Sequence, residues 1–164
     1  MHGREVTTRA RSARPMGMVT DMSQPTHSTL SGIPGGRVSY SDSTWQPIRN
    51  HFGITAFGVN AYTATRAGDS IIDDHDHADS SSEQHQELYF VHAGVARFVV
   101  DGLEVDAPVG TFVSAHDVTT RRSATALTDG TIVLVIGAEV GAPFEITPAE
   151  REDLASLGFA TNPA

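Results

Sequence analysis

Short hydrophobic runs, separated by Gly, Pro and Asp, make up most of the chain after about residue 37. The runs are rich in β-branched and aromatic residues, which is typical of β-strands. We expect strands at residues 54–63, 88–92, 96–100, 111–114 and 131–136. Many short strands with few helical patterns between them predict an all-β sandwich or barrel.

Two turn signals lie between these runs. Ala93 and Gly94 are expected to join residues 88–92 to residues 96–100 as a tight hairpin. Asp101 and Gly102 form a dipeptide that strongly favours a second hairpin turn. Consecutive short strands joined in this way are typical of antiparallel sheets.

One helix is predicted near the C-terminus. Thr147 and Glu150 are spaced as a capping box, and Pro148 stands between them at the first helical position. Gly158 is a typical residue just past a helix end. Apolar residues such as Leu154 are expected to fix this helix to the outside of the β-domain.

The first 36 residues differ from the rest of the chain. They are rich in Ser, Thr, Pro and Gly, they show no apolar periodicity, and they carry four arginines against two acidic residues. We therefore expect a disordered N-terminal tail at residues 1–36 and one domain at residues 37–164. A transit peptide is the other interpretation of such an Arg-rich, acid-poor leader.

Composition narrows the classes of function. The 164 residues are 39% hydrophobic, enough for one packed core, and no run of about 18 apolar residues is available to span a membrane. A net charge of −9 makes nucleic acid an unexpected partner. The absence of cysteine excludes disulfides and thiolate metal sites and favours a cytoplasmic location, while the absence of lysine excludes Schiff-base catalysis.

Two stretches carry a resemblance to a known family. Residues 68–94 (GDSIIDDHDHADSSSEQHQELYFVHAG) resemble the first signature of the cupin superfamily, which has an HxH pair, a glutamate, then six residues and a glycine; here the glutamate is Glu87 and the glycine is Gly94. Residues 105–122 (VDAPVGTFVSAHDVTTRR) resemble the second signature, with Gly110 at the start of its strand. The chain thus resembles small single-domain bacterial cupins. This resemblance implies an RmlC-like jelly roll, an antiparallel double-sheet β-barrel of roughly eight or more strands.

The resemblance also implies a metal site of three histidines and one carboxylate inside the barrel, from which this sequence departs. His75 and His77 form the HxH pair, and residues two apart on a strand face the same side. Nine residues then separate His77 from Glu87, where the signature has three or four; His85 is close enough to supply a nitrogen instead. The second signature places Arg121 where a ligand histidine is usual, and a cation cannot bind a metal.

Two interpretations of the pocket remain open. In one, a divalent transition metal (Fe, Mn, Ni, Cu or Zn) binds to His75, His77, His85 and Glu87. In the other, no metal binds, and Arg121 reaches across the barrel to neutralise a buried Glu87 carboxylate. Under both, Glu87 is the candidate catalytic residue, and the candidate pocket residues are Tyr89, Phe98, His116 and Arg121.

The function expected from this pattern is the binding of a small-molecule metabolite inside the barrel. The pattern is compatible with an enzyme, but the sequence assigns no reaction to it. A metal-dependent oxygenase or isomerase is the first alternative, and a non-catalytic sensor or interaction domain is the second. Outward-facing Leu88 and Phe90, together with residues 54–63, offer apolar surface that predicts a homodimer.

Overall fold

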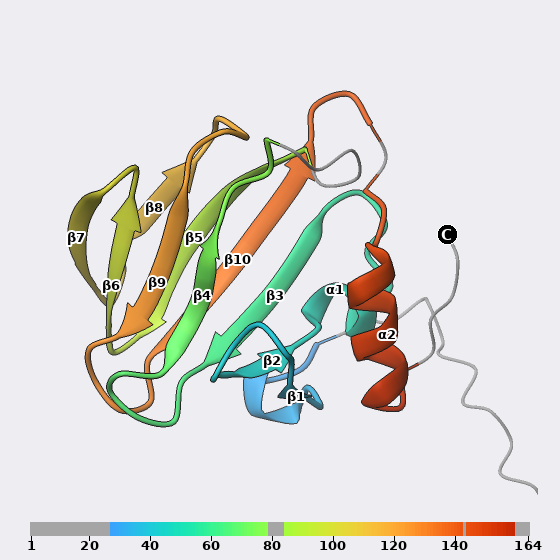
Figure 1. The fold of residues 1–164 in the computed structure, drawn as a ribbon. Coiled ribbons are helices and arrows are strands. Elements are labelled where there is room, and N and C mark those ends of the chain that lie inside the picture. The colour runs from blue at the N-terminus through green and yellow to red at the C-terminus, as the bar shows by residue number, and fades with distance from the viewer. Residues whose placement is uncertain (1–26, 79–83, 143, 160–164) are drawn as a thin grey trace, which may run out of the picture.

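A computed structural model describes residues 27–78, 84–142 and 144–159 of the chain. These residues form two antiparallel sheets that face each other (Figure 1). In order across the larger sheet, the strands are β1 (Gly36–Arg37), β2 (Thr44–Gln46), β3 (Gly58–Thr63), β10 (Ile132–Glu139), β5 (His85–Ala93) and β8 (Phe112–Ala115). The smaller sheet contains β4 (Ser70–His75), β9 (Arg122–Ala126), β6 (Val95–Val100) and β7 (Leu103–Pro108). The helical elements are η1 (Leu30–Gly32), α1 (Ile48–Phe52) and α2 (Pro148–Ser156), so the predicted all-β jelly roll with a short C-terminal helix is confirmed.

The core lies between the two sheets and follows from the alternation of side chains along each strand. On β5, Tyr89 and Val91 are buried, whereas Leu88 and His92 on the other face are exposed. Phe98 on β6 projects from the smaller sheet and packs against Tyr89, with ring centroids 5.4 Å apart. The period-two pattern therefore identified correctly which face of β5 is internal.

The five predicted strands are all present, with shifted ends. The run at residues 54–63 becomes a strand only at Gly58, and the run at residues 131–136 continues to Glu139 as β10. The sequence pattern did not predict β4 and β9, because β4 ends in acidic and histidine residues and β9 is largely Ser, Thr and Ala. These two strands pair with each other and carry residues that matter for the site.

The hairpin predicted at Gly94 is wrong. Strand β5 pairs with β10 and β8, while β6 pairs with β7 and β9, so the chain crosses from one sheet to the other at this glycine. Gly94 has a φ of 70°, and Thr131 lies directly beside it. The turn at Asp101 and Gly102 does form a hairpin, since Val100 pairs with Leu103 and both turn residues have positive φ.

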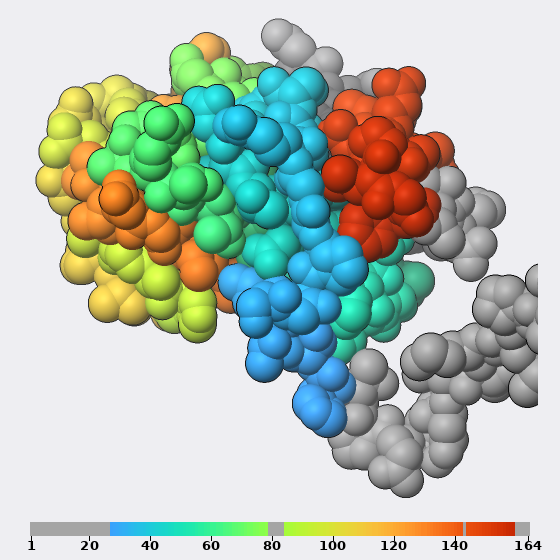
Figure 2. Space-filling view, turned by 90° about the horizontal axis from the view of Figure 1, so that it is seen from below, coloured from blue at the N-terminus to red at the C-terminus, as the bar shows by residue number. Residues whose placement is uncertain are grey.

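Helix α2 begins and ends as predicted. The Thr147 hydroxyl accepts a hydrogen bond from the Glu150 backbone N–H, Pro148 opens the helix, and Gly158 follows its end with a φ of 79°. Leu154 is buried, and Leu157 contacts Gly36 of β1 closely. Figure 2 shows α2 (red) beside the chain that precedes β3 (blue to cyan). None of the helices described is long and apolar enough to span a bilayer.

Most of the expected N-terminal tail, residues 1–26, lies outside the described residues. The remaining part, residues 27–36, contacts the domain. Ile33 is buried, and the Gln46 side-chain amide donates hydrogen bonds to the carbonyl oxygens of Leu30 and Ile33. Residues 30–33 therefore pack against the domain, although composition alone assigns them to the tail.

Candidate functional site

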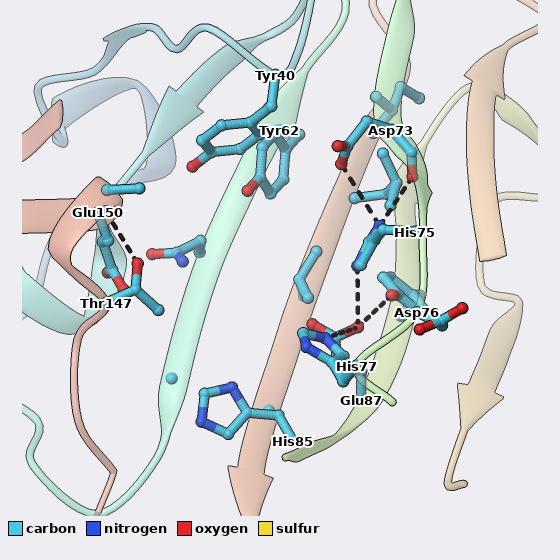
Figure 3. Close-up of a pocket in the computed structure, with 18 of the residues that line it drawn as sticks. Tyr40, Tyr62, Asp73, His75, Asp76, His77, His85, Glu87, Thr147 and Glu150 are labelled. Atoms are coloured by element: carbon cyan, nitrogen blue, oxygen red, sulfur yellow. Dashed lines mark hydrogen bonds and ion pairs between the residues drawn. The ribbon is translucent and has the colours of Figure 1, made fainter. Parts of the chain in front are cut away.

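A cavity of about 320 Å³ opens between the two sheets at the end covered by α2 (Figure 3). Strands β3, β4, β5 and β10 and the first turn of α2 contribute to it. Its wall is formed by Tyr40, Gly58, Asn60, Tyr62, Ile71, Ile72, Asp73, His75, Asp76, His77, His85, Glu87, Tyr89, Val135, Gly137, Phe144, Thr147, Ala149 and Glu150.

Two histidines and one glutamate meet on one side of this cavity. His75 is the last residue of β4, and His77 follows it in a loop fixed by a hydrogen bond from its backbone N–H to the Val118 carbonyl. The Nε2 atoms of His77 and His75 lie 3.6 Å and 4.0 Å from Glu87 Oε2. One donor atom from each of these three residues lies within 4.8 Å of the other two.

Glu87 is also bonded to the residues behind it. Arg122 donates to Glu87 Oε2 from Nε at 3.1 Å and from Nη2 at 2.5 Å, and the Tyr89 hydroxyl donates to the same oxygen at 2.5 Å. The Arg122 side chain is 1% exposed, and its Nη1 donates to the Thr120 carbonyl. The carboxylate thus has a cation and a hydroxyl on one side and two imidazoles on the other.

This environment keeps Glu87 ionised. Burial raises the pKa of the Glu87 carboxyl, but the hydrogen bond with His77, the charge of Arg122 and the hydrogen bond from Tyr89 outweigh burial and lower that pKa from 4.5 to about 2. Burial next to the Glu87 charge raises the pKa of Tyr89, so its hydroxyl stays protonated and acts as a donor. The centre of the site is therefore a buried carboxylate stabilised by its neighbours.

The predicted pair of Glu87 and Arg121 is wrong, because Arg122 takes the place assigned to Arg121. Arg121 precedes β9, its side chain is 58% exposed, and it donates to Asp74 Oδ2 at 2.8 Å. Arg122 is the first residue of β9 and faces the interior. A shift of one residue in register moves a side chain to the opposite face of a strand. Counting along the second signature points to Arg121, one residue before the arginine that faces Glu87.

The other predicted site residues are distributed over three environments. His85 lines the cavity but lies outside the group of three, stacked on Phe144 with ring centroids 4.8 Å apart. Phe98 belongs to the core and does not line the cavity. His116 is exposed and lines a separate hollow of about 360 Å³ on the outside of the larger sheet. Tyr89 lines the cavity as predicted.

Several residues of the cavity wall gave no signal in the sequence. Tyr40, Asn60 and Tyr62 belong to segments that resemble neither signature, and Glu150 was expected to serve only the helix cap. Arg122 could have been identified from the alternation in β9, since Ala124 and Ala126 are both buried and stand on its face.

The chemistry of the three converging residues fits a divalent transition metal. Two imidazoles and one carboxylate form the facial set found at non-heme Fe(II), and they also suit Zn(II) or Mn(II). Ligand atoms at about 2.0–2.2 Å from one metal lie about 3.0–3.5 Å apart. The two distances to Glu87 Oε2, 3.6 Å and 4.0 Å, are only slightly larger. All three donor atoms lie within 4.8 Å of one another, so side-chain rotations would be needed to bring them to bonding distance.

Comparison with known proteins gives the fold but no relative close enough for a function. No protein-family model matches the chain, and no curated protein matches its sequence. Among solved structures, an RmlC-like cupin from Desulfovibrio desulfuricans is 24% identical over 70% of this chain and 96% of its own, with a TM-score of 0.51. A predicted oxalate decarboxylase from Thermotoga maritima is 16% identical over 70% of this chain and 100% of its own, with a TM-score of 0.57.

A putative sugar phosphate isomerase from Acidithiobacillus ferrooxidans is also similar, at 16% identity over 62% of each chain and a TM-score of 0.51. The domain therefore has the RmlC-like cupin fold. Because neighbours with this fold carry different activities in their names, the fold is compatible with an enzyme or a binding domain and assigns no reaction.

Proposed function

We propose that this protein binds a small metabolite in the 320 Å³ cavity, on a divalent transition metal held by His75, His77 and Glu87. The observation that supports this most directly is the convergence of two imidazoles and a carboxylate at the cavity wall. When bound, such a metal supplies a Lewis acid that polarises an oxygen of the ligand.

The residues behind the carboxylate support the same proposal. Ligating carboxylates are commonly held by hydrogen bonds from a second layer of residues, and here Arg122 and Tyr89 fix the orientation of Glu87. His75 is oriented in the same way, since its Nδ1 lies 2.9 Å from the Asp73 carbonyl oxygen and its Nε2 points toward Glu87 (Figure 3).

Metal analysis of the purified full-length protein tests the proposal. We expect about one transition metal per chain, and less than about a tenth of that in His75→Ala, His77→Ala and Glu87→Gln, because three ligands are needed to retain the ion. His92→Ala, an exposed histidine on β5, is the matched control and should keep the metal. A wild-type protein that holds no metal and shows no visible absorption bands on titration with Co(II) would reject the proposal.

A metal-free binding site is the second candidate, and it rests on a specific observation. Glu87 Oε2 already receives donors from Arg122 and Tyr89, so the carboxylate is neutralised within the chain. In that case Glu87 and the two histidines would bind the metabolite directly by hydrogen bonds. The same metal analysis separates the two candidates, because only the first requires an ion.

A further inference from the structure

The wall opposite the histidine cluster carries a second polar group that the proposed function leaves unused. It contains Tyr40, Asn60, Tyr62 and Glu150, all of which line the cavity. Figure 3 shows Glu150 on the far side of the cavity from His75, with Tyr40 and Tyr62 between them. A small molecule bound near the histidines would therefore extend toward these four residues.

This second group is rich in hydrogen-bond acceptors. Asn60 Oδ1 is buried and accepts no hydrogen bond within the part of the chain that the structure describes. Leaving a buried acceptor unsatisfied is unfavourable, and a ligand that donates a hydrogen bond to it would recover that free energy. Tyr40 and Tyr62 share a hydrogen bond, and burial raises the pKa of both, so their hydroxyls remain neutral and can accept as well as donate.

The charge of the cavity points the same way. Among the residues that the structure describes, its wall contains the carboxylates of Asp73, Asp76, Glu87 and Glu150 and no arginine. Arg121 and Arg122 neutralise Asp76 and Glu87 from outside the wall, and the guanidinium of Arg49 lies over the ring of Phe144 without lining the cavity. At the end formed by Asn60, Tyr62 and Glu150, a phosphate or sulfate group would lack the cationic partner that it normally requires.

The first turn of α2 offers an anion at most the N–H of Ala149. A helix N-terminus can bind anions through its unpaired N–H groups. Here Pro148 has no N–H, and the N–H of Glu150 already donates to the Thr147 hydroxyl. The carboxylate of Glu150 itself stands at this positive end of the helix, where it takes the place of an external anion.

From these contacts we infer that the ligand carries hydroxyl or ammonium donors, and no phosphate or sulfate group, at the end facing Asn60, Tyr62 and Glu150. This inference rests on the proposed small-molecule function of the cavity and adds the chemical class of the molecule. It does not depend on whether the histidine cluster holds a metal.

Three probes on one scaffold test the inference: glucose, glucosamine and glucose 6-phosphate, which are neutral, cationic and anionic. Each is titrated into the full chain, and chemical-shift changes are followed at Asn60, Tyr62 and Glu150. We expect glucose or glucosamine to bind with millimolar affinity, and glucose 6-phosphate to bind at least about tenfold more weakly. Equal or tighter binding of the phosphate, or no binding of any probe at about 50 mM, would overturn the inference.

Variants then locate the contacts. Asn60→Leu should lower the affinity for the probe at least about fivefold, because it removes the buried acceptor. Glu150→Gln should weaken the binding of glucosamine more than the binding of glucose. Glu152→Gln, in the same helix but outside the cavity, should change the affinity for neither probe.

Metal content is measured on each variant at the same time. If a variant loses probe binding but keeps its metal content, the result supports the second polar group as a contact surface for the ligand. A wild-type protein without metal that still discriminates among the probes rejects the metal site alone and leaves the ligand class intact. Unchanged probe affinity in both Asn60→Leu and Glu150→Gln contradicts the inference, whatever the metal content.

Discussion

Arg121 and Arg122 are adjacent in the chain, yet their environments differ completely. Arg122 is buried and donates twice to Glu87, whereas Arg121 is exposed and pairs with Asp74 at the surface. A buried ion pair loses about 3–5 kcal/mol of stability when one partner is removed, because the other charge remains buried. An exposed pair contributes at most about 1 kcal/mol. The two arginines should therefore respond very differently to the same substitution.

Arg122→Met is expected to lower the free energy of unfolding by about 3–5 kcal/mol in the presence of a chelator, since it leaves the Glu87 carboxylate without its cation. Arg121→Met, the matched control, should leave the free energy of unfolding almost unchanged, because solvent screens the exposed pair with Asp74. Urea unfolding followed by fluorescence measures both. The double variant Arg122→Met with Glu87→Leu should recover much of the loss, and equal effects of the two single variants would contradict the buried pair.

The lowered pKa of Glu87 predicts a defined dependence of stability on pH in metal-free protein. Because the folded pKa of about 2 lies below the ordinary 4.5, the carboxylate stabilises the fold fully above pH 4.5, and this stabilisation is lost as the pH falls toward 2. Its full size is about 3 kcal/mol. The difference in unfolding free energy between wild type and Glu87→Gln should therefore shrink between about pH 5 and pH 3. A difference that stays constant over this pH range would contradict the lowered pKa of Glu87.

At this scale the sequence predicted the residues on β5 and the HxH pair, and it missed Arg122, Asn60 and Glu150. Period-two alternation placed Glu87 and Tyr89 inside, and the HxH spacing identified His75 and His77. The partner of Glu87 was missed because the signature was counted across the loop before β9, where one residue decides which arginine faces inward. Asn60 and Glu150 were missed because only the folded chain brings β3 and α2 to the same cavity.

Single strands are predictable from local patterns, but the sheet to which each strand belongs is not. The runs that became β5 and β6 were identified correctly, and the glycine between them was interpreted as a hairpin turn. A positive φ at glycine serves a hairpin and a crossing between sheets equally well, so the turn residue alone cannot distinguish the two. Pairing is decided by distant partners, here β10 and β8 for β5.

The crossing at Gly94 should be far less tolerant of substitution than the hairpin at Gly102. A Cβ at Gly94 would lie 2.5 Å from Thr131 Oγ1 and 2.8 Å from Thr131 Cα, whereas a Cβ at Gly102 meets nothing within 4 Å. Both residues have positive φ, which costs an L-residue about 1–2 kcal/mol. Gly102→Ala should lower the free energy of unfolding by about that amount. Gly94→Ala should lower it by about 3 kcal/mol or more, because of the added clash.

Thermal unfolding of these two alanine variants measures the difference directly. A Gly94→Ala protein as stable as Gly102→Ala would show that Thr131 can move away, and that the close approach of β10 to this turn does not constrain the fold.

The outer face of the larger sheet leaves apolar side chains exposed on the surface of the molecule. Leu88 is 37% exposed and Phe112 is 61% exposed. The ring centroids of Phe90 and Phe112 lie 4.6 Å apart. Phe112 belongs to β8, which is the edge strand of this sheet. A contiguous apolar patch beside an open sheet edge favours association with a second copy of the chain, so the homodimer predicted from Leu88 and Phe90 stays a prediction with a defined surface.

Light scattering at tens of micromolar is expected to give twice the mass of one chain. Phe112→Asp should give a monomer, because a buried charge at the centre of a symmetric interface has no partner and appears twice. Val140→Asp is the control: this residue is 77% exposed in the turn after β10, outside the patch, and its substitution should leave the dimer intact. A wild-type protein that stays monomeric would refute the dimer. A Phe112→Asp protein that remains dimeric would place the interface on another face.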